Sequence, residues 1–136
     1  MKIVLDTNVL VSGLLSPFGP PARILQLLIS EALIICYDAR IMAEYRDVLG
    51  RPKFGFDQNA VQCLLDFLGQ NGEAVASVPL SESLPDKDDE IFLEAAISGK
   101  ADALVTGNLL HFPKHLCGGV KILSPADFLL YFKKKK

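Results

Sequence analysis

The amino-acid sequence predicts an α/β fold of three layers, with a mostly parallel sheet of about five strands between two layers of helices. Short apolar runs, each long enough for one buried strand, alternate along the chain with longer segments whose apolar residues recur at helical spacing. Strands that alternate with helices form parallel sheets with helices on both faces. The length of 136 residues, half of them hydrophobic, fits a single domain.

The expected elements follow one another with turn or cap residues between them. The strands are expected at residues 3–5, 33–37, 74–78, 103–105 and 120–123. A helix is expected directly after the first strand, and further helices at residues 22–33, 39–49, 58–68, 91–97 and from Pro125 onward. Three of the helices are preceded by residues that favour the N-cap position: Asp38, Asp57 and Ser124. The domain is expected to span residues 1–132, and residues 133–136, all lysine, to form a basic, disordered tail.

Composition narrows the class of protein. A net charge of −2 argues against nucleic-acid binding by the whole surface, but not against an enzyme with a local contact patch. No apolar run reaches the ~18 residues that span a bilayer, and the chain opens on a strand-like segment, so we expect neither a membrane span nor a signal peptide. Three widely separated cysteines indicate reduced thiols and a cytoplasmic protein.

Polar residues follow two of the expected strands where each strand ends. Asp6 comes directly after the first strand, and Thr106 and Asn108 follow the fourth. A carboxylate at the end of a buried strand is costly unless it is paired or coordinates a ligand, and ligands of open α/β sheets lie at the carboxyl ends of strands. The alternative is that Asp6 or Thr7 only caps the following helix.

Further carboxylates lie on two expected helices. Glu44 falls inside the apolar stripe of its helix, although it could also lie at the edge of that stripe and reach solvent. The acidic residues Asp86, Asp88 and Asp89 open a later helix, where the helix dipole alone would favour them. Helical spacing aligns both Asp88 and Asp89 with apolar positions, so periodicity does not choose between them.

These groups can meet at one edge of a parallel sheet, where several carboxylates would repel one another. A divalent cation removes that conflict. Ligands that are all oxygens suit Mg²⁺ or Mn²⁺ better than zinc, and such an ion can activate water toward a phosphodiester.

Four stretches of the sequence, in this order, resemble the PIN-domain family, and in particular the toxins of prokaryotic toxin–antitoxin pairs. They are residues 3–15, 43–45, 85–96 and 101–108. The resemblance implies a PIN-like fold and a metal-dependent endoribonuclease that hydrolyses single-stranded RNA. It also implies a homodimer and a small antitoxin partner.

The resemblance also implies roles for individual residues. Asp6, Glu44 and Asp89 match the family's first three acids, which hold the metal, and Asp86 matches an acid often seen just upstream of the third. Asp88 is the register alternative to Asp89. Asn108 stands where many relatives carry a fourth acid; its amide oxygen can ligate a metal but brings no charge. Asn8 and Thr106 match supporting positions.

Two other interpretations compete with the nuclease. A haloacid-dehalogenase-like phosphatase also begins with a strand and an aspartate, but Asn8 replaces the acid which that chemistry needs. A PIN-fold module that binds RNA or a protein partner with weak or no catalysis is favoured by Asn108.

Overall fold

The computed structural model describes residues 1–135 and contains one sheet of five parallel strands. The strands are β1 (Lys2–Leu5), β2 (Ile34–Tyr37), β3 (Glu73–Ala74), β4 (Ala103–Val105) and β5 (Lys121–Leu123). Their order in the sheet is β3-β2-β1-β4-β5, which places β1 at the centre. The β1 residues Ile3, Val4 and Leu5 are fully buried, as a central strand covered on both faces requires.

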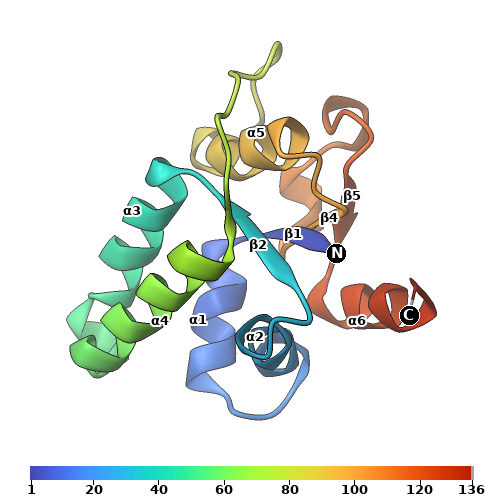
Figure 1. Cartoon of the computed structure of the whole chain (residues 1–136). Helices are drawn as coiled ribbons and strands as arrows, with labels where there is room; N and C mark the ends of the chain where they lie inside the picture. Colours follow the sequence, from blue (N-terminus) through green and yellow to red (C-terminus); the bar gives the residue numbers. More distant parts are fainter. Residues whose placement is uncertain (136) are drawn as a thin grey trace.

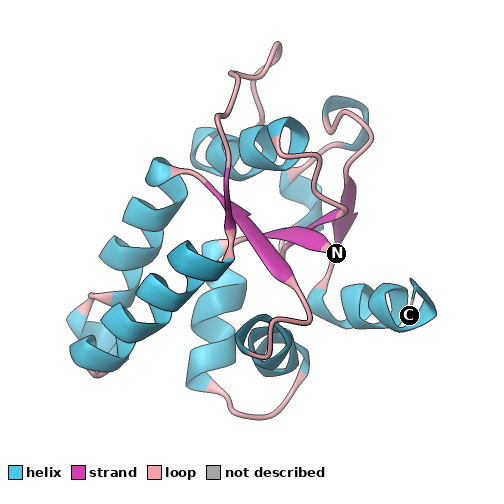
Figure 2. Ribbon diagram, viewed as in Figure 1, coloured by secondary structure: helices cyan, strands magenta, loops and turns pink. Residues whose placement is uncertain are grey.

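Helices cover both faces of this sheet (Figures 1 and 2). Helix α5 (Glu90–Ser98) lies on one face, in contact with β1, β2 and β4. The opposite layer contains α1 (Thr7–Leu15), α2 (Pro20–Ile29), α4 (Gln58–Asn71) and α6 (Pro125–Lys135). Helix α3 (Ala39–Leu49) stands beside the end of β2 and contacts α1, α4 and α5. The predicted three-layer α/β fold with about five parallel strands is therefore confirmed.

Two elements end several residues earlier than predicted. Helix α2 ends at Ile29 rather than 33, because Glu31 adopts a left-handed φ of 64° and the Ala32 N–H turns back to the Leu27 carbonyl. Strand β3 has two residues instead of five. Its partner β2 ends where Asp38 caps α3. The last backbone hydrogen bond between the two segments therefore runs from the Val75 N–H to the Tyr37 carbonyl.

The segment that follows β3 is held by side chains rather than by a strand ladder. Ser77 donates to Asp38 at 2.7 Å, and the Leu80 N–H donates to Glu94 at 3.1 Å. Arg40 bridges both carboxylates, at 2.8 Å from Asp38 and 2.7 Å from Glu94. This network fixes the path of the chain over α5 toward the acidic residues at 86–89.

The C-terminal helix is longer than expected. Helix α6 includes Lys133, Lys134 and Lys135, three of the four residues predicted to form a disordered tail, and Lys136 lies outside the described residues. The Ser124 hydroxyl accepts from the Asp127 N–H at 3.1 Å, in line with its expected capping role. The division into residues 1–132 and a tail stays a prediction. None of the described helices is long and apolar enough to span a bilayer.

Candidate metal and catalytic site

Asp6 follows β1 directly and takes the N-cap position of α1. Its backbone carbonyl accepts from the N–H groups of Val9 and Leu10, but its side chain caps nothing. The carboxylate is 5% exposed and instead accepts from the Thr106 hydroxyl at 2.7 Å. The side chain of Asp6 therefore does not cap the helix, contrary to the alternative interpretation of the sequence.

Thr106 joins the ends of β1 and β4. Its buried hydroxyl donates to Asp6 and accepts from the Asn108 N–H at 3.0 Å. One side chain thus orients the Asp6 carboxylate and sets the position of Asn108. This geometry fits the supporting role expected for Thr106.

Glu44 reaches the same place from α3. Its neighbour Tyr45 is fully buried, and the Tyr45 hydroxyl donates to the carbonyl of Leu5, the last residue of β1. This bond ties α3 to the strand end that carries Asp6. Glu44 itself is partly buried, so it lies at the margin of the apolar stripe rather than in the core.

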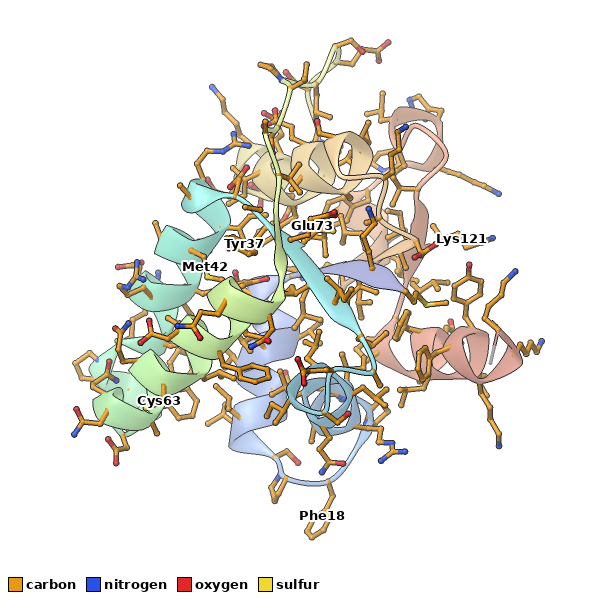
Figure 3. All side chains as sticks on the ribbon, in the orientation of Figure 1. Phe18, Tyr37, Met42, Cys63, Glu73 and Lys121 are labelled. Carbon is orange, nitrogen blue, oxygen red and sulfur yellow. The ribbon has the colours of Figure 1, made fainter. Side chains whose placement is uncertain are left out.

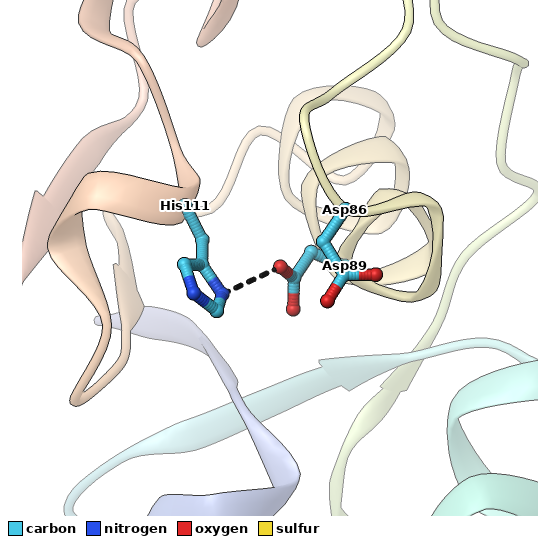
Figure 4. A group of neighbouring side chains, drawn as sticks. All are labelled: Asp86, Asp89 and His111. Atoms are coloured by element: carbon cyan, nitrogen blue, oxygen red, sulfur yellow. Dashed lines mark hydrogen bonds and ion pairs between the residues drawn. The ribbon is translucent and has the colours of Figure 1, made fainter.

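The acidic segment enters through the short helix η2 (Lys87–Asp89). Asp86 caps this turn by accepting from the Asp88 N–H at 3.0 Å. Asp88 is exposed, whereas Asp89 is 9% exposed and its Oδ2 lies 2.9 Å from Nδ1 of His111 (Figure 4). Of the two register alternatives, Asp89 is the buried one.

These groups line one cavity of about 290 Å³ at the carboxyl ends of β1 and β4. Every site residue predicted from the sequence except Thr106 is part of the lining, and Thr106 lies behind it, bonded to Asp6. The cavity is lined by Asp6, Thr7, Asn8, Glu44, Val48, Arg51, Asp86, Asp88, Asp89, Phe92, Asn108 and His111. Five carboxylates therefore face one guanidinium and one imidazole.

Burial and nearby charges change the pKa of two of these carboxylates, Asp89 and Glu44. Burial raises the pKa of Asp89, and the nearby charges of Asp6 and Asp86 raise it further, against the opposing effect of His111. Burial likewise raises the pKa of Glu44, with Asp47, Asp88 and Asp6 adding to the effect and Arg51 opposing it. Negative charge on Asp89 and on Glu44 is thus disfavoured without a cation.

The donor set fits a hard divalent cation. Carboxylate and amide oxygens are the ligands that Mg²⁺ and Mn²⁺ take in proteins. In addition, Thr7 is 3% exposed and its Oγ1 is buried without a hydrogen-bond partner among residues 1–135. A buried hydroxyl without a partner costs free energy, so its place in the lining is consistent with a ligand or an ordered water beside it.

The sequence did not predict the imidazole and the guanidinium of the lining, which belong to His111 and Arg51. His111 lies three residues after Asn108, in the short helix η3 (Leu109–His111), and that short spacing is the signal that could have found it. Arg51 follows the end of α3 and pairs with Asp47 at 3.2 Å. Nothing in its local sequence distinguishes it from a solvent-exposed arginine.

The cysteines lie outside the cavity and are free thiols. Burial raises the pKa of Cys36 to about 11, and the Glu73 carboxylate adds to this effect. Glu73, which is labelled in Figure 3, also pairs with Lys2 at 3.0 Å. Lys2 and Glu73 begin β1 and β3, whereas Asp6 follows the end of β1. Cys63 is exposed on α4 (Figure 3). None of the three is therefore placed as a nucleophile for this site.

Fold and cavity together define a class of protein: a parallel α/β domain with a carboxylate-lined cavity at the ends of its central strands. The chain belongs to the PIN domain family, whose model matches residues 2–110. PIN domains are generally nucleases, and this membership supports a ribonuclease-like activity.

Two individual proteins are also similar. The uncharacterized protein MJ1680 from Methanocaldococcus jannaschii is 27% identical over 145 residues, which cover 98% of this chain and 93% of that protein. A chain in the crystal structure of VapBC2 from Rickettsia felis bound to a DNA fragment from their promoter matches with a TM-score of 0.57. That match is 19% identical and covers 91% of this chain and 98% of the other, and it shows a shared fold.

Proposed function

We propose that this protein is a metal-dependent endoribonuclease that hydrolyses phosphodiester bonds of single-stranded RNA. The observation that carries the proposal is the meeting of five carboxylates in one cavity of a PIN domain. We further propose that it acts as the toxin of a toxin–antitoxin pair. The similarity in fold to a chain of the VapBC2 structure supports this.

In this proposal Asp6, Glu44 and Asp89 hold a Mg²⁺ or Mn²⁺ ion, and Asn108 offers a neutral oxygen beside them. When bound, such an ion lowers the pKa of water and offsets the charge that develops on the phosphate. Thr106 keeps the Asp6 carboxylate in one orientation through its 2.7 Å bond. Asp86, at the rim of the cavity, orients the attacking water.

Two further lining residues would contact the substrate. Arg51 carries the guanidinium in the cavity wall, and guanidinium groups bind phosphate oxygens through paired N–H donors. Asn8 is exposed in the lining, where its amide can bond to the ribose or the phosphate. The carboxylates repel an RNA strand unless a cation is present, so these contacts and the cation act together.

We also propose that the protein forms a homodimer, binds a small antitoxin protein and is located in the cytoplasm. A small reading frame next to the gene would support the antitoxin.

Cleavage of labelled single-stranded RNA tests the activity, with Mn²⁺, Mg²⁺ or EDTA present. We expect wild type to cleave with metal and not with EDTA, and Asp6→Asn to lose at least ~100-fold in rate, because an amide cannot replace the charge at the ion. The matched control is Asp66→Asn, an exposed acid on α4 outside the cavity, which should cleave like wild type. Equal cleavage by Asp6→Asn and wild type would contradict the proposal.

A second candidate is a PIN-fold module that binds RNA or a protein partner with little or no catalysis. Asn108 favours it, because the cavity wall there carries an amide in place of a charge. RNA binding by folded wild type, with no metal-dependent cleavage of several RNAs, would select this alternative.

A further inference from the structure

We propose that His111 contributes an imidazole nitrogen to the cation site, which therefore selects Mn²⁺ and later transition-metal ions over Mg²⁺. The inference rests on the proposed function, since it requires that the cavity holds a metal ion. It concerns a residue outside the set expected from the sequence.

The spacing of three side chains carries the inference. One ligand atom each from Asp86, Asp89 and His111 can be chosen so that all three lie within 4.8 Å of one another (Figure 4). Ligands that share an ion at about 2.0–2.2 Å from it lie within such distances of one another. The 2.9 Å contact between His111 Nδ1 and Asp89 Oδ2 shows that the imidazole already faces the carboxylate.

The short helix that carries His111 is anchored at both ends. The His111 N–H donates to the Asn108 carbonyl at 3.0 Å, and Asn108 is tied through Thr106 to Asp6. The next residue, Phe112, is 3% exposed and packs in the core. His111 is therefore held next to the carboxylates by the same connection that orients Asp6.

The ligand types determine which ions the site prefers. Imidazole is a ligand for transition metals, whereas Mg²⁺ is held by oxygens and keeps several of its waters. Mn²⁺ accepts both nitrogen and carboxylate ligands. An imidazole added to the carboxylate ligands of this cavity, with positions left for water and phosphate, therefore gives Mn²⁺ an advantage that an all-oxygen site would not.

If His111 were only a hydrogen-bond partner of Asp89, it would orient the Asp89 carboxylate without changing the preference of the site for Mn²⁺ over Mg²⁺. Substitution with asparagine separates the two roles, because the Asn amide can still bond to Asp89 but cannot supply an imidazole nitrogen.

Pulsed electron paramagnetic resonance of bound Mn²⁺ tests the inference on protein without a histidine tag. The chain has two histidines, and His115 lines a different cavity, formed by residues 78–82, the end of α5 and residues 115–118. His115→Asn is therefore the matched control. We expect ¹⁴N coupling from a directly bound imidazole in wild type and in His115→Asn, and none in His111→Asn. In titrations, the ratio of Mn²⁺ to Mg²⁺ affinity should fall at least ~10-fold in His111→Asn and His111→Asp.

Mn²⁺ that binds wild type without ¹⁴N coupling, or coupling that persists in His111→Asn, overturns the inference. RNA cleavage measured on the same samples keeps this result separate from the proposed function. Metal-dependent cleavage without nitrogen coupling rejects the role of His111 alone. Absence of both Mn²⁺ binding and cleavage rejects the nuclease as well.

Discussion

Asp6, Thr106 and Asn108 show how single residues build the cavity. The Thr106 hydroxyl uses both its donor and its acceptor capacity. Its bond to Asp6 connects the ends of the neighbouring strands β4 and β1, and its bond from the Asn108 N–H holds the turn that follows β4. Asp6 was identifiable from the sequence because a carboxylate after a buried run needs a partner. Thr106 was expected at the same edge as a supporting residue, but its hydrogen bond to Asp6 in particular was not predictable, since it depends on how β1 and β4 lie side by side.

Replacing Thr106 with valine should lower both stability and activity. The loss of a buried hydroxyl leaves the Asn108 N–H without its acceptor, which costs roughly 1–3 kcal/mol. Urea unfolding measures this cost, and the rate of RNA cleavage should fall because Asp6 loses its fixed orientation. Thr106→Ser keeps the hydroxyl and is expected to retain most of the activity. Equal losses in both variants would indicate that packing of the methyl group, not hydrogen bonding, is responsible.

The raised pKa of Asp89 predicts how the metal-free protein responds to pH. An acid whose pKa is higher in the folded state than in the unfolded state destabilises the fold when it is charged. Asp89→Asn should therefore stabilise the metal-free protein at pH 7, by roughly 0.5–2 kcal/mol. The gain should shrink as the pH falls through the raised pKa of Asp89 and vanish below about 3.8, the ordinary value, where both proteins are uncharged at this position.

Chemical unfolding of the two proteins between pH 3.5 and pH 8, with EDTA present, measures this difference. An Asp89→Asn protein that is less stable than wild type at pH 7 would show that the bond to His111 outweighs burial. Saturating Mn²⁺ should reverse the order, because only wild type retains the charged ligand.

At the scale of elements, the site depends on where α3 and η3 are held against the strand ends. The bounds of α3 follow from its Asp38 cap and its apolar spacing, and the structure reproduces residues 39–49. Local signals set such bounds because caps act within one helical turn. The short length of β3 and the place of His111 depend instead on contacts between segments far apart in the chain, which periodicity does not encode.

Removing the Tyr45 hydroxyl should loosen α3 from β1. In Tyr45→Phe the buried Leu5 carbonyl loses this donor, with an expected cost of roughly 1–3 kcal/mol in the free energy of unfolding. Because α3 carries Glu44, cation affinity should fall as well, as Mn²⁺ titration would show. Tyr37→Phe is the matched control: its hydroxyl donates to the Gly69 carbonyl at 2.6 Å, outside the cavity, and it should leave cation affinity unchanged.

At the scale of the whole molecule, the sheet brings distant segments of the chain to one edge. The layer order and the parallel sheet were predictable because alternating strands and helices allow few other arrangements. The cavity was predictable as a meeting place of carboxylates, but not in its full lining. Arg51 and His111 reach it from connections whose paths depend on the packing of the complete fold.

Cation binding should stabilise the folded protein as a whole. An ion at 100 times its dissociation constant adds about 2.7 kcal/mol if it binds only the folded state. Differential scanning fluorimetry should show a higher unfolding temperature for wild type with Mn²⁺, by several degrees, and little change for Asp6→Asn. A similar shift in both proteins would place the stabilising ion elsewhere.

The most direct test of the central claim, that the carboxylates at this sheet edge form a cation site, is an anomalous difference map from a crystal of the protein soaked with Mn²⁺. We expect a peak in the cavity within ligand distance of Asp6 and Asp89. A fully soaked crystal with no peak among these carboxylates, or with its only strong peak elsewhere on the molecule, would contradict the claim.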